Sequence, residues 1–185
     1  MTYILASASP RRKELLELAQ LPFEIHVPHA EEILPASLAP AQCAEHIAAI
    51  KAEAAARDLP NACIIAADTI VVVDKTILGK PKDAADAARM LRLLSGREHT
   101  VITGVCLLNA TAMQKTIFSQ KTAVRFYSLG DAEIEAYVRT GEPMDKAGAY
   151  GIQGKGALLV ESIAGDYFNV VGLPLARLMR ELRNL

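Results

Sequence analysis

The strongest constraint on the fold is the almost uninterrupted apolar run at residues 62–73. A strand this apolar is typical of a sheet that is covered on both faces. Asp68 and Thr69 interrupt the run, and a buried carboxylate needs a cation, hydrogen-bond donors or a metal ion to stabilise it. Such exceptions to the hydrophobic pattern gather at functional sites. We therefore interpret Asp68 as a functional residue, with a structural aspartate as the alternative.

The turn at residues 6–13 joins a first predicted strand to a helix. Ser9 and Pro10 fit the N-cap and the first helical position. A helix N-terminus binds anions through its unpaired N–H groups, and Arg11 and Arg12 add guanidinium groups that grip phosphate oxygens in pairs. The turn therefore predicts a phosphate-bearing ligand. The alternative is an ordinary capped helix with a solvated basic first turn.

The rest of the chain alternates strand-like and helix-like patterns. Strands are predicted at residues 3–6, 23–27, 62–67 with its continuation at 70–73 after the interruption by Asp68 and Thr69, 76–78, 99–108, 116–127 and 158–163. Helices are predicted after Pro10, Pro40, Asp83, Asp131 and Pro174, a long glycine-rich loop at 142–156 and a turn at 165–169. This order predicts an α/β chain with a mixed sheet rather than a regular Rossmann alternation.

Composition excludes several classes of protein. The 185 residues suffice for one large domain or two small lobes. A formal net charge of −1 argues against a broad nucleic-acid-binding face. No apolar run reaches membrane-spanning length, and the chain enters its first strand without a signal segment, so we expect a cytoplasmic protein.

Cys43, Cys63 and Cys106 lack metal-type spacing and are expected to be reduced and buried.

The candidate side chains together match the needs of phosphoanhydride hydrolysis. They are Ser7, Arg11 and Arg12 for phosphate, Lys51, Lys80 and Lys146 for further positive charge, and Glu32 and Asp68 for a divalent metal or for activating water. Such a reaction requires stabilised charge on the phosphoryl oxygens and a base that orients or deprotonates water. The sequence contains no Walker lysine motif and no G-x-G-x-x-G motif that would place the phosphates elsewhere.

The sequence resembles the Maf family of nucleoside triphosphate pyrophosphatases. The matching segments run in order through almost the whole chain: residues 5–12, Glu32, Lys51, 67–69, 79–81, 142–154 and 171–175. The resemblance implies a mixed, strongly twisted sheet in an elongated two-lobed α/β body with a central cleft, similar to inosine triphosphate pyrophosphatases. Residues 1–185 would then form a single domain of two lobes.

The same resemblance implies the activity and the roles of residues. Family members hydrolyse nucleoside triphosphates to a monophosphate and pyrophosphate with a divalent metal, Mg²⁺ first, with Mn²⁺ or Co²⁺ as substitutes. Asp68 corresponds to the proton acceptor for the attacking water. The supporting positions are Ser7 and Arg12 for substrate and Glu32, Lys51 and Lys80 for catalysis, while Arg11, Thr69 and Gln153 set base specificity; the metal ligands are not implied.

Two residues indicate the branch of the family that the chain resembles. The branch that acts on dTTP and UTP carries Pro10 before the two arginines and Thr69 after the aspartate, whereas the 7-methyl-GTP branch has an aromatic residue and a glutamine there. We expect dTTP and UTP, and modified pyrimidine nucleotides, as substrates. The partners expected are the nucleotide and a second copy in a homodimer, with no nucleic acid and no membrane. Two alternatives stay open: a non-catalytic nucleotide-binding regulator of cell division, and a purine pyrophosphatase acting on ITP or XTP.

Overall fold

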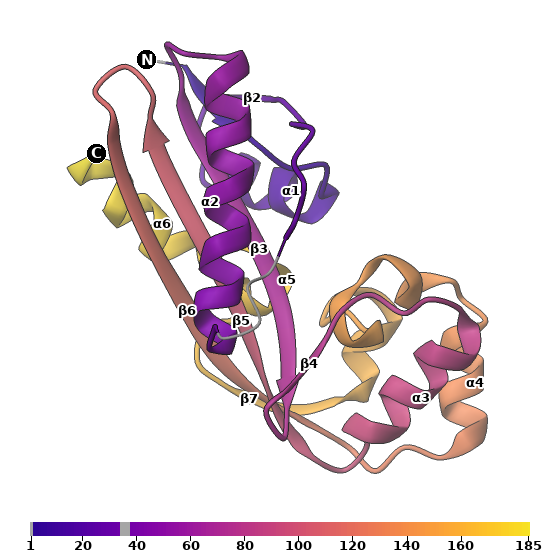
Figure 1. Ribbon diagram of the computed structural model, residues 1–185. Coiled ribbons are helices and arrows are strands. Elements are labelled where there is room, and N and C mark those ends of the chain that lie inside the picture. Colours follow the sequence, from indigo (N-terminus) through magenta and orange to yellow (C-terminus); the bar gives the residue numbers. More distant parts are fainter. Residues whose placement is uncertain (1, 34–37) are drawn as a thin grey trace. The chain divides into compact units, whose positions relative to one another are not determined.

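The computed structural model describes residues 2–33 and 38–185. Within these residues a seven-stranded sheet has the order β2-β1-β3-β5-β6-β7, and β4 pairs with β3 (Figure 1). The strands are β1 (Tyr3–Leu5), β2 (Phe23–Ile25), β3 (Cys63–Val73), β4 (Thr76–Leu78), β5 (Glu98–Asn109), β6 (Gln114–Phe126) and β7 (Val160–Ala164). The pairs β1–β2 and β1–β3 are parallel, whereas β3–β4 and β6–β7 are antiparallel. The predicted α/β class with a mixed sheet is confirmed.

Six α-helices accompany the described strands. They are α1 (Pro10–Leu18), α2 (Pro40–Asp58), α3 (Ala84–Leu94), α4 (Asp131–Val138), α5 (Tyr167–Val171) and α6 (Leu175–Glu181), and short 3₁₀ turns occupy Glu142–Asp145, Ala147–Ala149, Gly154–Leu159 and Leu182–Asn184. In the part of the chain that the structure describes, no helix combines the length and the hydrophobicity needed to cross a bilayer.

The chain forms two compact units. The first contains Met1–Thr69, Thr103–Gln120 and Gly172–Leu185, and the second contains Ile70–Ile102 and Lys121–Val171. The long strands β3, β5 and β6 each contribute residues to both units. Each unit has a hydrophobic core of its own.

In the first unit, the alanine-rich face of α2 packs against the sheet (Figure 1). Ala48 and Ala52 of the helix contact a core that includes Ile64 of β3. Gly104 of β5 permits this close approach, because a Cβ at that position would lie 2.3 Å from the backbone carbon of Ala44. The small residues on both sides therefore set how closely α2 lies on the strands.

In the second unit, α3 and α4 pack together over a core that contains three aromatic rings. His99 of β5 donates to or accepts from the Tyr150 hydroxyl at 2.6 Å, and both rings meet Phe126 edge to face. Because the surrounding core excludes water, burial lowers the pKa of His99 to about 4 and raises that of Tyr150. His99 is therefore neutral in the folded protein near pH 7.

The order of strands and helices follows the prediction with one correction, an additional short helix. β3 continues through Asp68 and Thr69 to Val73, as the apolar run predicted, and Lys51 of α2 pairs with the Asp68 carboxylate. The predicted turn at 165–169 instead begins a short helix, α5. Asp166 starts this helix by accepting a hydrogen bond from the Phe168 N–H at 2.9 Å.

Replacing His99 with Gln is expected to reduce the loss of unfolding free energy that occurs as the pH falls below neutrality. The unfolded state protonates His99 near pH 6.5 and the folded state only near pH 4, so this histidine destabilises the fold as the pH falls between these values. This preferential protonation of the unfolded state lowers the free energy of unfolding by about 2.5 kcal/mol near pH 4.5. Urea unfolding of the wild type and the His99→Gln variant between about pH 7 and pH 4.5 measures the two slopes.

The control is His29→Gln, because His29 is exposed. Its slope should match that of the wild type. Equal slopes for the wild type and His99→Gln would contradict the assignment of a neutral, buried His99.

Candidate functional site

Three of the predicted site residues, all in the first unit, form a cluster in which the ammonium group of Lys51 contacts two carboxylates. Lys51 of α2 places its Nζ 2.8 Å from Asp68 Oδ1 and 3.1 Å from Glu32 Oε1. The side chains of Lys51 and Asp68 are only 18% and 21% exposed, whereas that of Glu32 is 52% exposed. The helix supplies the lysine from the edge of its packed stripe, β3 supplies the aspartate, and the segment after β2 supplies the glutamate.

The Lys51–Asp68 pair is the strong contact in this group. Two charges that are mostly shielded from water attract each other more than exposed pairs do, and removing one partner leaves the other desolvated and uncompensated. Lys51 thus holds one oxygen of Asp68 in a fixed position. Lys51 is therefore a paired lysine rather than a solvated one.

Two carboxylates share this single ammonium, so the group of Asp68, Glu32 and Lys51 carries one net negative charge. The charged guanidinium of Arg12 also interacts with both carboxylates and offsets this charge. In residues 2–33 and 38–185, no group of three or more His, Cys, Asp or Glu side chains is arranged to hold a metal ion. A divalent cation here would therefore need further oxygen ligands, of the kind that a polyphosphate and water provide.

Arg12 of α1 joins three segments of the first unit. Its Nε donates to the Gly172 carbonyl at 2.9 Å, one terminal nitrogen donates to Ser7 Oγ at 3.1 Å, and the other donates to Thr69 Oγ1 at 3.1 Å. Burial lowers the pKa of Arg12, and the nearby Asp68 carboxylate opposes that shift. The guanidinium stays charged, so buried positive charge lies at the start of α1, where Ser9 accepts from the Arg12 N–H as the predicted N-cap.

Successive side chains of β3 point to opposite faces of the strand. Asp68 accordingly contacts Lys51 of α2, and Thr69 contacts Arg12 of α1. Thr69 is half-buried, and its Oγ1 also lies 2.9 Å from Oγ1 of Thr103, a fully buried residue of β5. Thr103 was not predicted from the sequence, because a threonine in a β-rich segment carries no signal of its own.

Three further predicted positions are Arg11, Lys80 and Gln153. Arg11 follows Pro10 in the first turn of α1 and is half-buried. Lys80 is exposed after β4, and Gln153 is half-buried at the N-cap of the Gly154–Leu159 turn, both in the second unit. Their roles in binding and catalysis stay predictions.

The glycine-rich loop that carries Gln153 is ordered by internal hydrogen bonds. Lys146 Nζ donates to the Glu142 carbonyl and to Asp145 Oδ1, both at 2.6 Å, so this lysine is engaged within the loop. The Gly151 N–H donates to the Tyr137 hydroxyl at 3.3 Å. A loop braced in this way presents its side chains in a defined arrangement.

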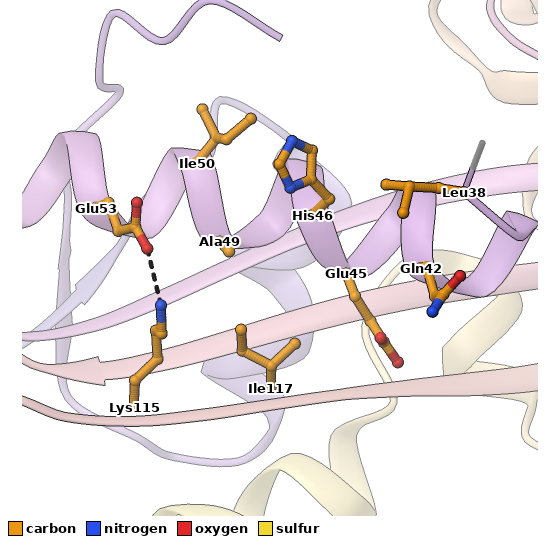
Figure 2. Close-up of a pocket in the computed structure, with 9 residues that line it drawn as sticks. All are labelled: Leu38, Gln42, Glu45, His46, Ala49, Ile50, Glu53, Lys115 and Ile117. Carbon is orange, nitrogen blue, oxygen red and sulfur yellow. Dashed lines mark hydrogen bonds and ion pairs between the residues drawn. The ribbon is translucent and has the colours of Figure 1, made fainter. Parts of the chain in front are cut away.

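A hollow of about 350 Å³ lies between α2 and β6 of the first unit (Figure 2). His46 and Ile50 line it from the helix, Ile117 lines it from the strand, and Lys115 reaches across to Glu53 at 2.9 Å. None of the predicted site residues is among its lining residues. This hollow is therefore separate from the network around Arg12 and from the Lys51 pair.

The three cysteines are buried inside the fold. Cys43, Cys63 and Cys106 are buried and free, as predicted. Burial raises the pKa of the Cys63 thiol to about 11 and that of Cys106 to about 12, so both are thiols rather than reactive thiolates near neutral pH.

Comparison with known proteins identifies relatives along nearly the whole chain. The Maf-like protein family model matches residues 2–185. A protein of Bacillus cytotoxicus is 54% identical over 182 residues, which cover 98% of this chain and 94% of the relative. A Geobacillus protein is 53% identical, covering 98% and 97%, and a Bacillus mycoides protein is 52% identical, covering 97% and 93%.

All three relatives are named dTTP/UTP pyrophosphatase. The match extends over both units of the structure, and the resemblance inferred from the motifs is confirmed. The chain belongs to the Maf family.

Proposed function

We propose that this protein is a nucleoside triphosphate pyrophosphatase that hydrolyses dTTP and UTP, and modified pyrimidine nucleotides, to a monophosphate and pyrophosphate. The observation that carries the proposal is the Lys51–Asp68 pair, which keeps a charged carboxylate inside an otherwise apolar strand. A protein that only needed this strand to fold would gain nothing from such a pair. The names of the full-length relatives supply the substrate class.

Asp68 is the base in the proposed mechanism. Lys51 holds Asp68 Oδ1 at 2.8 Å, and the second oxygen accepts the proton of the attacking water. The water oxygen bonds to the α-phosphorus, the bond from that phosphorus to the bridging oxygen breaks, and pyrophosphate leaves. Ser7 and Arg12 at the start of α1 bind the phosphates, with Lys80 as a further cation.

Glu32 is the proposed metal ligand of this chain. Its side chain is more exposed than those of Lys51 and Asp68, so its carboxylate is the one in this group that an ion reaches most readily. Glu32 would hold Mg²⁺ jointly with the substrate phosphates, which is a usual pattern for this ion, and Mn²⁺ or Co²⁺ would substitute. When bound, the ion would offset negative charge on the phosphates.

The proposal also includes the cytoplasmic location and the homodimer expected from the family resemblance. Light scattering tests the second of these. The regulator and the purine pyrophosphatase are outcomes that the next two experiments separate from the proposed enzyme.

Replacing Asp68 with Asn should abolish turnover while nucleotide binding persists. The amide fills the same volume and keeps a contact to Lys51, but it does not accept a proton, so we expect kcat for dTTP to fall by about 10²–10⁴. Pyrophosphate release in the presence of Mg²⁺, and calorimetric binding of UTP, measure the two effects. Asp58→Asn, an exposed aspartate at the end of α2, is the matched control. Tight binding without turnover in the wild type would instead favour the regulator.

Gln153 is the residue proposed to contact the base edge. Its amide both donates and accepts, as the carbonyl and N3–H of thymine and uracil require. We expect Gln153→Ala to reduce the preference for dTTP over ITP and XTP, as measured by the ratio of kcat/KM values. An unchanged preference would contradict this role, and a wild type that prefers ITP or XTP would contradict the pyrimidine assignment.

A further inference from the structure

Gln153, the residue proposed to contact the base, begins the 3₁₀ turn Gly154–Leu159 without capping it. The first N–H groups of a helical turn have no acceptor within the turn. A polar side chain at the N-cap position commonly accepts from one of them. Gln153 occupies that position with an extended backbone, but its side chain makes no capping hydrogen bond. The cap of this turn therefore comes from elsewhere in the chain.

Glu142 supplies the missing acceptor. Its Oε1 accepts a hydrogen bond from the N–H of Lys155, the second residue of the turn, at 3.2 Å. Gly154 leaves room for the carboxylate, because a Cβ at that position would lie 3.0 Å from Oε2 and 3.1 Å from Oε1 of Glu142. The Glu142 side chain thus lies directly against the residue that follows Gln153.

Glu142 is itself held in place by its backbone. Its N–H donates to Thr140 Oγ1 at 3.1 Å, and its carbonyl accepts from Lys146 Nζ at 2.6 Å. Its second carboxylate oxygen, Oε2, is buried and has no hydrogen-bond partner in the part of the chain that the structure describes. A buried acceptor without a partner costs free energy, so packing alone would not favour a carboxylate here.

The segment that carries Gln153 forms a loop that is closed at its base. Gly151 and Gly156 lie against each other, since a Cβ at Gly156 would be 2.2 Å from the Gly151 carbonyl oxygen. The limb after Gln153 is bonded to Glu142 through the Lys155 N–H. Gln153 therefore lies between two fixed points, the contact at the base of the loop and the bond to Glu142.

We propose that Glu142 is a positioning residue for base recognition: it caps the turn in place of Gln153 and so leaves the Gln153 amide to meet the edge of a pyrimidine base. An amide oxygen that capped its own turn would no longer be available to the N3–H of uracil or thymine. Glu142 acts through Gln153 and does not contact the nucleotide. This role of Glu142 rests on the proposed function, because it requires Gln153 to contact the base.

A double-mutant cycle on base preference tests this role. Glu142→Ala removes the acceptor, so the Lys155 N–H becomes free to bind the Gln153 amide oxygen instead. We expect the ratio of kcat/KM for dTTP to that for ITP to fall roughly three- to tenfold, the size of one neutral hydrogen bond. In a Gln153→Ala background the same replacement should leave the ratio unchanged, because the side chain that Glu142 positions is gone.

Three further variants serve as controls. Glu142→Gln keeps an accepting oxygen for the Lys155 N–H and should retain most of the wild-type ratio. Gly154→Ala disturbs the same contact from its other side, so it should lower the ratio even if Glu142→Ala does not fold. Glu161→Ala removes an exposed glutamate of β7 that pairs with Arg125 at 3.0 Å, and it should leave the ratio unchanged.

A purely structural role for Glu142 would lower the melting temperature and slow dTTP and ITP equally. An unchanged ratio in a folded Glu142→Ala protein would therefore overturn the proposed positioning role. A fall of the same size in the Gln153→Ala background would also overturn it, because Glu142 would then act independently of Gln153. A wild type that releases pyrophosphate from neither nucleotide would overturn the proposed function itself.

Discussion

The contact between Lys51 and Asp68 is the interaction on which the first unit depends. An aspartate in the middle of β3 would end the strand if its charge were left unpaired. The ammonium at 2.8 Å lets β3 run unbroken from Cys63 to Val73. The same contact sets one carboxylate oxygen in a fixed place and leaves the other for chemistry. One ion pair thus serves both the strand and the proposed reaction.

Arg12 plays a comparable part on the other side of β3. It binds the turn after β1, the strand itself and the start of the C-terminal segment through Ser7, Thr69 and Gly172. Lysine could not make these three planar contacts at once. The two half-buried cations therefore have different roles: Lys51 holds the carboxylate of Asp68, and Arg12 holds the hydroxyls of Ser7 and Thr69.

Sequence patterns predicted much of this architecture because burial leaves periodic traces. The run at 62–73 and the helix starts at Ser9–Pro10 and Pro40 are all local signals, and Asp68 was conspicuous as a charge among apolar residues. Thr103 leaves no such trace, since its contact with Thr69 exists only in the folded chain. The partner of Asp68 could not be predicted for the same reason, because Lys51 lies on a different element.

The most direct test of the central claim is hydrolysis of dTTP in ¹⁸O-labelled water, with mass spectrometry of both products. Attack by water on the α-phosphorus, with Asp68 as the base, predicts that the label appears in the monophosphate and that the pyrophosphate stays unlabelled. Label in the pyrophosphate would mean attack on the β-phosphorus. Release of labelled inorganic phosphate in place of pyrophosphate would mean a different reaction altogether, and either result would contradict the account.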